Sequence, residues 1–370
     1  MEELEAQDGP AEKLKFRRAV HLARQRVAQS LWTLLAVDAQ LPQHLQGLKD
    51  YFLLAKGDFY HAFLLEADGL LVQEPKEATA DGRLAAAQSQ AALKSNAESD
   101  PCFPLVRLHL AASGEGAGAQ VQTATGLRIH TPAYDSWDDL ALAYRVEWPL
   151  GLLLTSGVLA QYNALFRYLF RLRRVQHDLD VAWSYLRRAG KGRGDNSGSA
   201  ASDVAKWQLR HKMAHLVNNL QVYIQIDVIE PQFRSLLERV EEAQDFKEAE
   251  RLHSVYLSRL IAQSFLDVST IAGMLQAVMQ LCRRFRALVE SPGGGAPEAF
   301  KQLEDEFFLK SKTLYTVLKS DRLAESERAP YLRQFLLRLN YNSYVDHTIL
   351  LDRMDRASQP GKPGPNGTTS

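Results

Sequence analysis

The sequence predicts a mainly helical protein, a multi-helix bundle with a small minor β-sheet. Apolar residues recur every three or four positions through most of the chain, which is the period of an amphipathic helix. Alternation of apolar and polar residues, the pattern of a half-buried strand, is confined to two short segments. Hydrophobic residues make up 46% of the 370 positions, which is enough apolar material for a large core.

The clearest alternation predicts a strand over residues 140–148, with one face buried. Its apolar positions are Leu140, Leu142, Tyr144, Val146 and Trp148. Pro149 should end this strand, because proline has no N–H to donate to a neighbouring strand. A second alternation, at residues 105–110, predicts another short strand.

The segment after Pro149 is strongly apolar, and its length distinguishes a membrane span from a core helix. The run Leu150–Ala160 has 11 residues, whereas a span needs about 20, so we exclude a membrane segment. Ser156 can cap a helix that continues to about residue 188. We expect Leu159, Phe166 and Leu169 in the core, together with Leu220 and Trp148.

Periodicity places further helices on both sides of this one. Gly57 should take the left-handed position that closes one helix, and Asp58 should cap the next. Asp245 and Glu248 have the spacing of a capping box. The expected helices cover residues 12–36, 45–56, 58 onward, 204–229, 232–243, 245–289, 298–319 and 328–340.

Composition predicts where the folded domain ends and where loops interrupt it. Residues 189–203 are rich in glycine and serine, which is typical of a flexible insertion, and residues 291–297 read as a loop. We expect disorder at 1–11 and 346–370, since these ends have little to bury, and one domain at 12–345.

Charge and cysteine content limit the possible partners. Lysine plus arginine (44) balances aspartate plus glutamate (44), and there are two cysteines, which indicates a reducing compartment rather than a disulfide scaffold. Local imbalances remain: residues 156–193 hold eight bases and two acids, and residues 227–250 hold eight acids and three bases. We interpret these segments as solvated helix faces or as a docking surface with complementary charge.

The chain offers few candidates for chemistry. His211 and His215 stand four residues apart, a spacing that zinc can use, but no cysteine or third histidine accompanies them. The glycine-rich "GKGRGD" lacks the phosphate-loop pattern. We therefore predict no catalytic residue, cofactor or metal site, and no nucleic-acid partner.

Four blocks, in one order, resemble the gamma-tubulin complex proteins. They are "KDYFLLAKGDFYHAFL" (49–64), "LALAYRVEWPLGLLLTSGVLAQYNALFRYLFRLRRVQHDLDVAW" (140–183), "KWQLRHKMAHLVNNLQVYIQIDVIEPQF" (206–233) and "LLRLNYNSY" (336–344). The resemblance covers about residues 12–345. It implies a helical C-terminal grip domain that binds gamma-tubulin, partners that include other gamma-tubulin complex proteins, and a role in microtubule nucleation at a microtubule-organising centre or spindle pole.

Family members also carry an N-terminal grip domain, thought to join neighbouring subunits side by side, and this chain begins near where that domain ends. We therefore expect gamma-tubulin binding without independent ring assembly. Two alternatives stay open: an RNA-binding helical protein that uses the 167–193 basic segment, and a metalloprotein or hydrolase centred on His211 and His215. The candidate partner-binding residues are Arg167, Arg171, Arg174, Asn218, Asn219, Gln221, Gln225 and Asp227.

Overall fold

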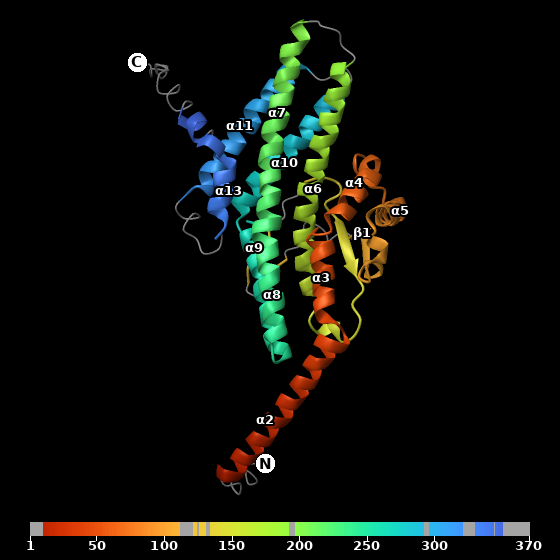
Figure 1. Ribbon diagram of the computed structural model, residues 1–370, viewed down its shortest axis with the longest axis vertical. Coiled ribbons are helices and arrows are strands. Elements are labelled where there is room, and N and C mark those ends of the chain that lie inside the picture. The colour runs from red at the N-terminus through yellow and green to blue at the C-terminus, as the bar shows by residue number, and fades with distance from the viewer. Residues whose placement is uncertain are drawn as a thin grey trace, which may run out of the picture. The chain divides into compact units, whose positions relative to one another are not determined.

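The computed structural model describes residues 10–111, 121–123, 126–130, 134–191, 197–291, 296–320, 330–343 and 345–350. The described chain is mainly helical, with one two-stranded antiparallel sheet, which confirms the predicted fold class (Figure 1). None of its helices is both long enough and apolar enough to span a bilayer.

The chain divides into two compact units, and several helices contribute to both. Unit 1 comprises residues 1–174 and 224–272, and unit 2 comprises residues 175–223 and 273–370. Elements that begin in unit 1 are α2 (Pro10–Thr33), the π-helix η1 (Leu34–Asp38), α3 (Leu41–Phe52), α4 (Gly57–Leu71), α5 (Glu77–Ser95), β1 (Val106–Leu110), β2 (Leu140–Tyr144), α6 (Ser156–Lys191), α8 (Glu230–Glu242), α9 (Phe246–Gln263) and α10 (Ser269–Glu290). Those that begin in unit 2 are α7 (Ser197–Val222), the π-helix η5 (Tyr223–Ile229), α11 (Pro297–Leu318) and α13 (Leu332–Leu339).

The sheet of unit 1 pairs β1 with β2 so that Leu108 lies opposite Leu142. The outward backbone groups of both strands bond to amide side chains of neighbouring helices. Asn163 of α6 accepts from the Leu142 N–H (2.8 Å) and donates to its carbonyl (3.0 Å). Gln88 of α5 accepts from the Leu108 N–H (3.0 Å) and donates to the Val106 carbonyl (2.8 Å). Each free edge is therefore closed by a helix side chain.

Aromatic side chains fill the interior of unit 1. The rings of Tyr60 on α4 and Phe166 on α6 lie 6.2 Å apart, and those of Phe52 on α3 and Tyr162 on α6 lie 5.7 Å apart. These rings are fully buried, so α6 carries the apolar stripe that the periodicity predicted. Unit 2 has its own core, in which the rings of Tyr223 and Phe335 stack at 5.0 Å.

Three of the five predicted core residues are confirmed and two are wrong. Phe166, Leu169 and Leu220 are buried, whereas Leu159 is half-buried and Trp148 is 76% exposed. Strand β2 ends at Tyr144 rather than at residue 148. Alternate residues face the same side only within a strand, so the pattern does not predict burial of Trp148, which follows the end of β2.

The break between α9 and α10 corrects the single helix expected over residues 245–289. The backbone reverses at Phe265, whose φ is 60°, while Leu266 N–H donates to the Ile261 carbonyl (3.1 Å). This is a Schellman C-cap with a phenylalanine where glycine is usual. The Asp245 cap itself is confirmed, since Glu248 N–H donates to Asp245 Oδ1 (2.8 Å).

Other boundaries also differ from the sequence predictions. The left-handed residue after α3 is Leu54 (φ 57°), and Gly57 and Asp58 instead form the first turn of α4. Helix α5 was not predicted. Helical backbone extends into both ends of the 189–203 insertion, up to Lys191 and again from Ser197, and residues 192–196 lie outside the described chain. Of the expected disordered ends, residues 10–11 and 346–350 are helical, and residues 1–9 and 351–370 are outside the described chain.

Candidate functional site

The three arginines proposed as partner-binding residues are buried in unit 1 and hold acidic side chains. Arg171 pairs with Asp138 (Nη2–Oδ1, 2.7 Å) and Arg174 pairs with Asp135 (Nη1–Oδ2, 2.6 Å). Arg167 is buried beside them. Burial lowers the pKa of Arg171, and the neighbouring aspartates oppose that shift.

The interpretation of the 156–193 segment as a solvated helix face is therefore wrong for these three arginines. Their aspartate partners come from the loop before β2, more than thirty residues earlier in the chain, so the pairing was not visible in the local sequence. The RNA-binding alternative loses these three residues, because a buried guanidinium does not contact phosphate, and of its basic segment the exposed Arg187 and Arg188 remain.

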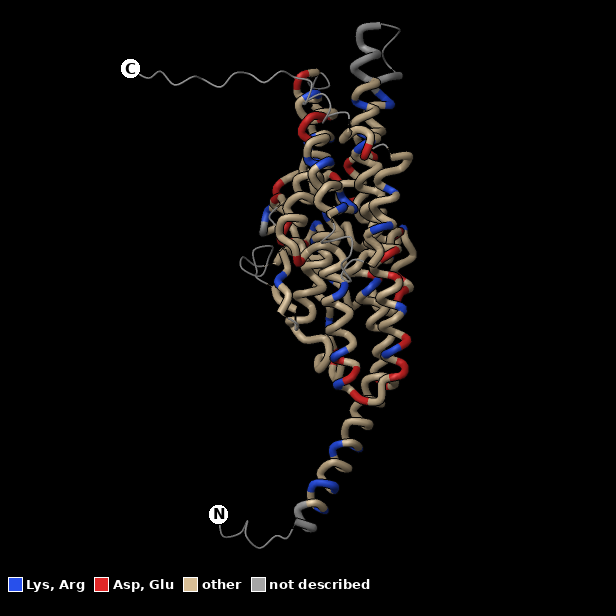
Figure 2. The backbone as a smooth tube through the Cα atoms, turned by 90° about the vertical axis from the view of Figure 1, so that its left-hand side faces the viewer, with Lys and Arg blue, Asp and Glu red and all other residues tan. Residues whose placement is uncertain are grey.

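Exposed charge on unit 1 lies elsewhere. Helix α2 carries five bases and no acid between residues 14 and 33, and Figure 2 shows these basic positions along it. The acids of the 227–250 segment gather at the end of α8 and the start of α9, where Glu238, Glu241, Glu242 and Asp245 are exposed. The acidic half of the expected docking surface is thus on the surface.

The polar residues of the "NNLQVYIQID" block divide between the two units. In unit 2, Asn218 is exposed and accepts a hydrogen bond from Gln176 (2.9 Å), while Asn219 donates to the His215 carbonyl (2.7 Å). The buried Gln221 Oε1 has no hydrogen-bond partner among the described residues. In unit 1, Gln225 donates to the Leu53 carbonyl (2.8 Å), which supports a structural role, and Asp227 is half-buried.

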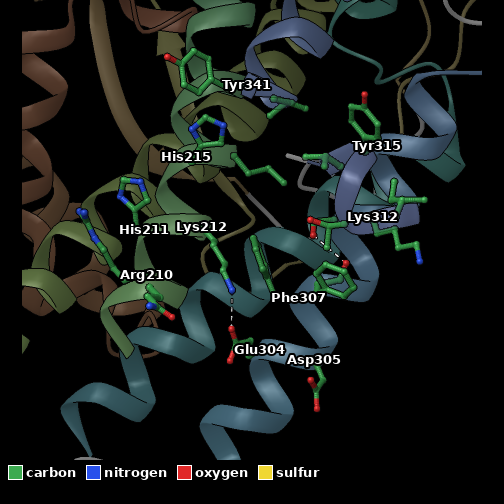
Figure 3. Close-up of a pocket in the computed structure, with 18 of the residues that line it drawn as sticks. Arg210, His211, Lys212, His215, Glu304, Asp305, Phe307, Lys312, Tyr315 and Tyr341 are labelled. Carbon is green, nitrogen blue, oxygen red and sulfur yellow. Dashed lines mark hydrogen bonds and ion pairs between the residues drawn. The ribbon is translucent and has the colours of Figure 1, made fainter. Parts of the chain in front are cut away.

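Unit 2 has a groove between α7 and α11, which we call the α7–α11 groove. It encloses about 870 Å³. The groove is lined by Trp183 of α6, by residues of α7 between 207 and 216, by residues between 339 and 349, and on α11 by Glu304, Asp305, Phe307, Phe308, Ser311, Lys312 and Tyr315. Figure 3 shows His211 and His215 on the α7 wall, with Phe307 and Tyr315 on the α11 wall. The two histidines were apparent in the sequence, but the α11 residues that face them across the groove were not.

The floor of this groove is apolar and its two walls are joined by an ion pair. Leu216, Phe307 and Tyr315 are buried beneath it. Lys212 Nζ on α7 lies 2.9 Å from Glu304 Oε1 on α11, and Figure 3 marks this contact. No group of three or more histidine, cysteine, aspartate or glutamate residues in the described chain could hold a metal ion.

The wall at residues 339–349 is held by Asn340. Its side-chain oxygen accepts from Val345 N–H (3.0 Å) and Asp346 N–H (3.1 Å), which caps the helical turn at 345–350. Lys319 at the end of α11 pairs with Asp346 (2.8 Å), and this contact lowers the pKa of the Asp346 carboxyl. The block "LLRLNYNSY" therefore positions one end of the groove.

Comparison with known proteins identifies the family. Residues 41–344 match the family described as gamma tubulin complex component C-terminal. The chain belongs to this family. It is 37% identical to gamma-tubulin complex component 4 of Arabidopsis thaliana over 91% of this chain and 48% of that protein. It is 34% identical to gamma-tubulin complex component 4 of Homo sapiens over 89% of this chain and 50% of that protein.

A more distant relative is gamma-tubulin complex component 3 of Arabidopsis thaliana, 27% identical over 72% of this chain and 31% of that protein. The chain thus spans about half the length of the component 4 relatives. The resemblance noted in the sequence is confirmed for this family. The matched region includes α7, α11 and Asn340 and hence most of the groove, whereas the lining residues Val345, Thr348 and Ile349 follow its end.

Proposed function

We propose that this chain binds gamma-tubulin and holds it within a complex that nucleates microtubules. The observation that carries the proposal is the family match over residues 41–344, with relatives named gamma-tubulin complex component 4. Other gamma-tubulin complex proteins are the proposed further partners, and the microtubule-organising centre or spindle pole is the proposed location.

The physical role of such a scaffold follows from the cost of association. The first tubulins to assemble lose translational and rotational freedom before lateral contacts compensate that loss. A scaffold that holds gamma-tubulin subunits side by side makes later encounters intramolecular and raises their effective concentration. The chain acts by positioning a partner, and no bond-making step is needed.

We propose that gamma-tubulin contacts the exposed polar stripe of α7, which runs through His211, His215, Asn218 and Asn219. These residues recur at helical spacing on one face of α7, and their amide and imidazole groups can form hydrogen bonds with a partner. The exposed acids at the end of α8 support a second element, electrostatic steering of the encounter, which salt would weaken.

The test is size-exclusion chromatography with light scattering on the chain mixed with gamma-tubulin. We expect a one-to-one complex without ring-sized assemblies. Asn218→Lys places an unmatched charge on the stripe and should weaken binding by about tenfold, as expected for loss of an interface contact. Lys310 on α11 is also exposed, but it belongs neither to the stripe nor to the groove. Lys310→Gln is therefore the control, and it should leave binding unchanged. Absence of any complex would refute the proposal.

A further inference from the structure

The α7–α11 groove has the dimensions of a helix-binding site. Its α7 wall runs from Trp207 to Leu216 and its α11 wall from Glu304 to Tyr315. At a rise of 1.5 Å per residue, these walls are about 14 and 16 Å long, which is about three turns of an α-helix. Each wall presents one helix face to the groove, and a third helix can pack into the channel between them.

Exposed aromatic side chains surround the apolar floor. Trp183 is 37% exposed, Phe308 is 38% exposed and Tyr341 is 70% exposed, and all three line the groove. A contiguous apolar patch with aromatic residues at its rim is typical of protein–protein contact sites. Tryptophan and tyrosine at such positions often supply most of the binding free energy.

The charges on the two walls specify the orientation of an occupant. The α7 wall presents the Arg210 guanidinium, whose partner Asp180 is itself exposed, and the ring nitrogens of His211 and His215. The α11 wall presents the exposed Asp305 carboxylate next to Glu304, and the half-buried Lys312 lies about two turns further along the same wall. A helix with acidic residues on its α7 edge and a basic residue opposite Asp305 would match both walls.

We propose that the α7–α11 groove binds an amphipathic helix of about three turns from a partner protein, apolar face inward and acidic edge against α7. The occupant carries apolar residues at i, i+3, i+4 and i+7, which reach the floor formed by Leu216 and Phe307. This inference goes beyond gamma-tubulin binding and does not depend on it, but His211 and His215 belong to both surfaces, so a helix in the groove and gamma-tubulin on the stripe would compete for them.

The chain's own C-terminal residues fit the groove poorly. Residues 351–370 follow in sequence the helical turn at 345–350, which contributes to the end wall. Their large apolar residues, however, are Leu351 and Met354 alone, and glycine and proline recur from residue 360 onward. That composition does not provide an apolar helix face of three turns.

The experiment is fluorescence anisotropy of two labelled synthetic peptides of about 14 residues titrated with the full chain. Both carry leucine and phenylalanine at i, i+3, i+4 and i+7. The first has glutamates on one flank and lysines on the other, arranged for the two walls, and the second has the flanks exchanged. We expect the first peptide to bind with micromolar affinity and the second about tenfold more weakly. Equal binding of both peptides, or binding of neither, overturns the proposal.

Two neighbouring apolar residues on α11 provide a matched pair of variants. Phe308→Ala should weaken binding of the first peptide by about tenfold, because the ring lies at the rim. Leu309→Ala, which changes a residue that is 54% exposed but outside the groove, should change the affinity less than about twofold. Equal effects of the two substitutions would show that the peptide binds elsewhere.

Two further variants identify the occupant. Asp305→Lys should favour the exchanged peptide over the first one, since it reverses the charge of the α11 wall; an unchanged preference contradicts the assigned orientation. A chain that ends at residue 350 should bind the first peptide with the affinity of the full chain. If binding appears only after this truncation, the C-terminal residues are the occupant and the partner proposal is wrong.

Discussion

Replacing Arg286 with methionine should strongly destabilise unit 2, because it leaves a carboxylate buried without its partner. Arg286 Nη1 on α10 lies 2.7 Å from Asp178 Oδ1 on α6, and their side chains are only 8% and 6% exposed. Removing one partner of a buried pair costs about 3–5 kcal/mol, mainly through the desolvated charge that remains. Asp178→Asn should cost less, since Arg286 also contacts Glu290 (3.1 Å).

The control is a second ion pair with the same separation but much greater exposure. Arg284, also on α10, lies 2.7 Å from Glu306, and these side chains are 53% and 38% exposed. Solvent screens such a pair, so Glu306→Gln should change the free energy of unfolding by at most about 1 kcal/mol. The N–O separation is the same in the two ion pairs, so a difference in the free energy of unfolding between the variants reports the effect of burial.

The assay is urea unfolding followed by circular dichroism. With a denaturant slope of about 3 kcal/mol per molar urea, Arg286→Met should lower the midpoint by about 1–1.7 M, and the control by about 0.3 M or less. The double variant Asp178→Leu/Arg286→Met should recover much of the loss, because it removes the buried carboxylate and leaves only Glu290, whose side chain is 33% exposed, without Arg286. Midpoints within 0.3 M of each other for Arg286→Met and Glu306→Gln would refute the reasoning.

Three further predictions concern unit 1 and use the same assay. Leu169→Ala removes a fully buried side chain and should cost about 2–5 kcal/mol; an unchanged midpoint would contradict the helix register. Gly47→Ala should cost about 1–3 kcal/mol, since its Cβ would stand 2.7 Å from Cys102 Sγ, whereas Gly69→Ala meets no atom within 4 Å and should be neutral or stabilising. Burial lowers the pKa of His253 to about 4, so below pH 6.5 the unfolded state binds more protons than the folded state. The free energy of unfolding should therefore fall by about 3 kcal/mol as the pH falls from 7 to 4. His253→Gln should reduce this pH dependence, and an identical pH profile in the variant would exclude His253 as its source.

Helices with a continuous apolar stripe were predictable, and those without one were not. Helix α6 was found because its buried apolar residues repeat from Tyr162 to Leu186. Helix α5 was missed because alanine fills much of its buried face and gives a weak periodic signal. The α9–α10 break was missed because Phe265 occupies the left-handed cap position, where glycine would have marked the end of a helix.

The candidate site was less predictable, because its parts are far apart in the chain. The α7–α11 groove joins side chains such as His211 and Phe308, and nothing in the local sequence of α7 indicates which helix faces it. Conversely, Arg171 and Arg174 belong to a conspicuous basic run, yet both are buried and form ion pairs with aspartates that are distant in the sequence. A cluster of charged residues in a sequence therefore predicts an exposed charged surface only when the ion-pair partners of those residues are known.

The hydrogen bonds that Gln88 and Asn163 form with the two strands affect how the sheet can associate with other molecules. A two-stranded sheet has two free edges, and each can pair with a strand from another molecule and start aggregation. Here Gln88 bonds to the outward Leu108 N–H and Val106 carbonyl, and Asn163 bonds to the outward N–H and carbonyl of Leu142, so an incoming strand would have to displace two helix-borne side chains. The sheet is therefore protected against edge-to-edge association with a strand from another molecule.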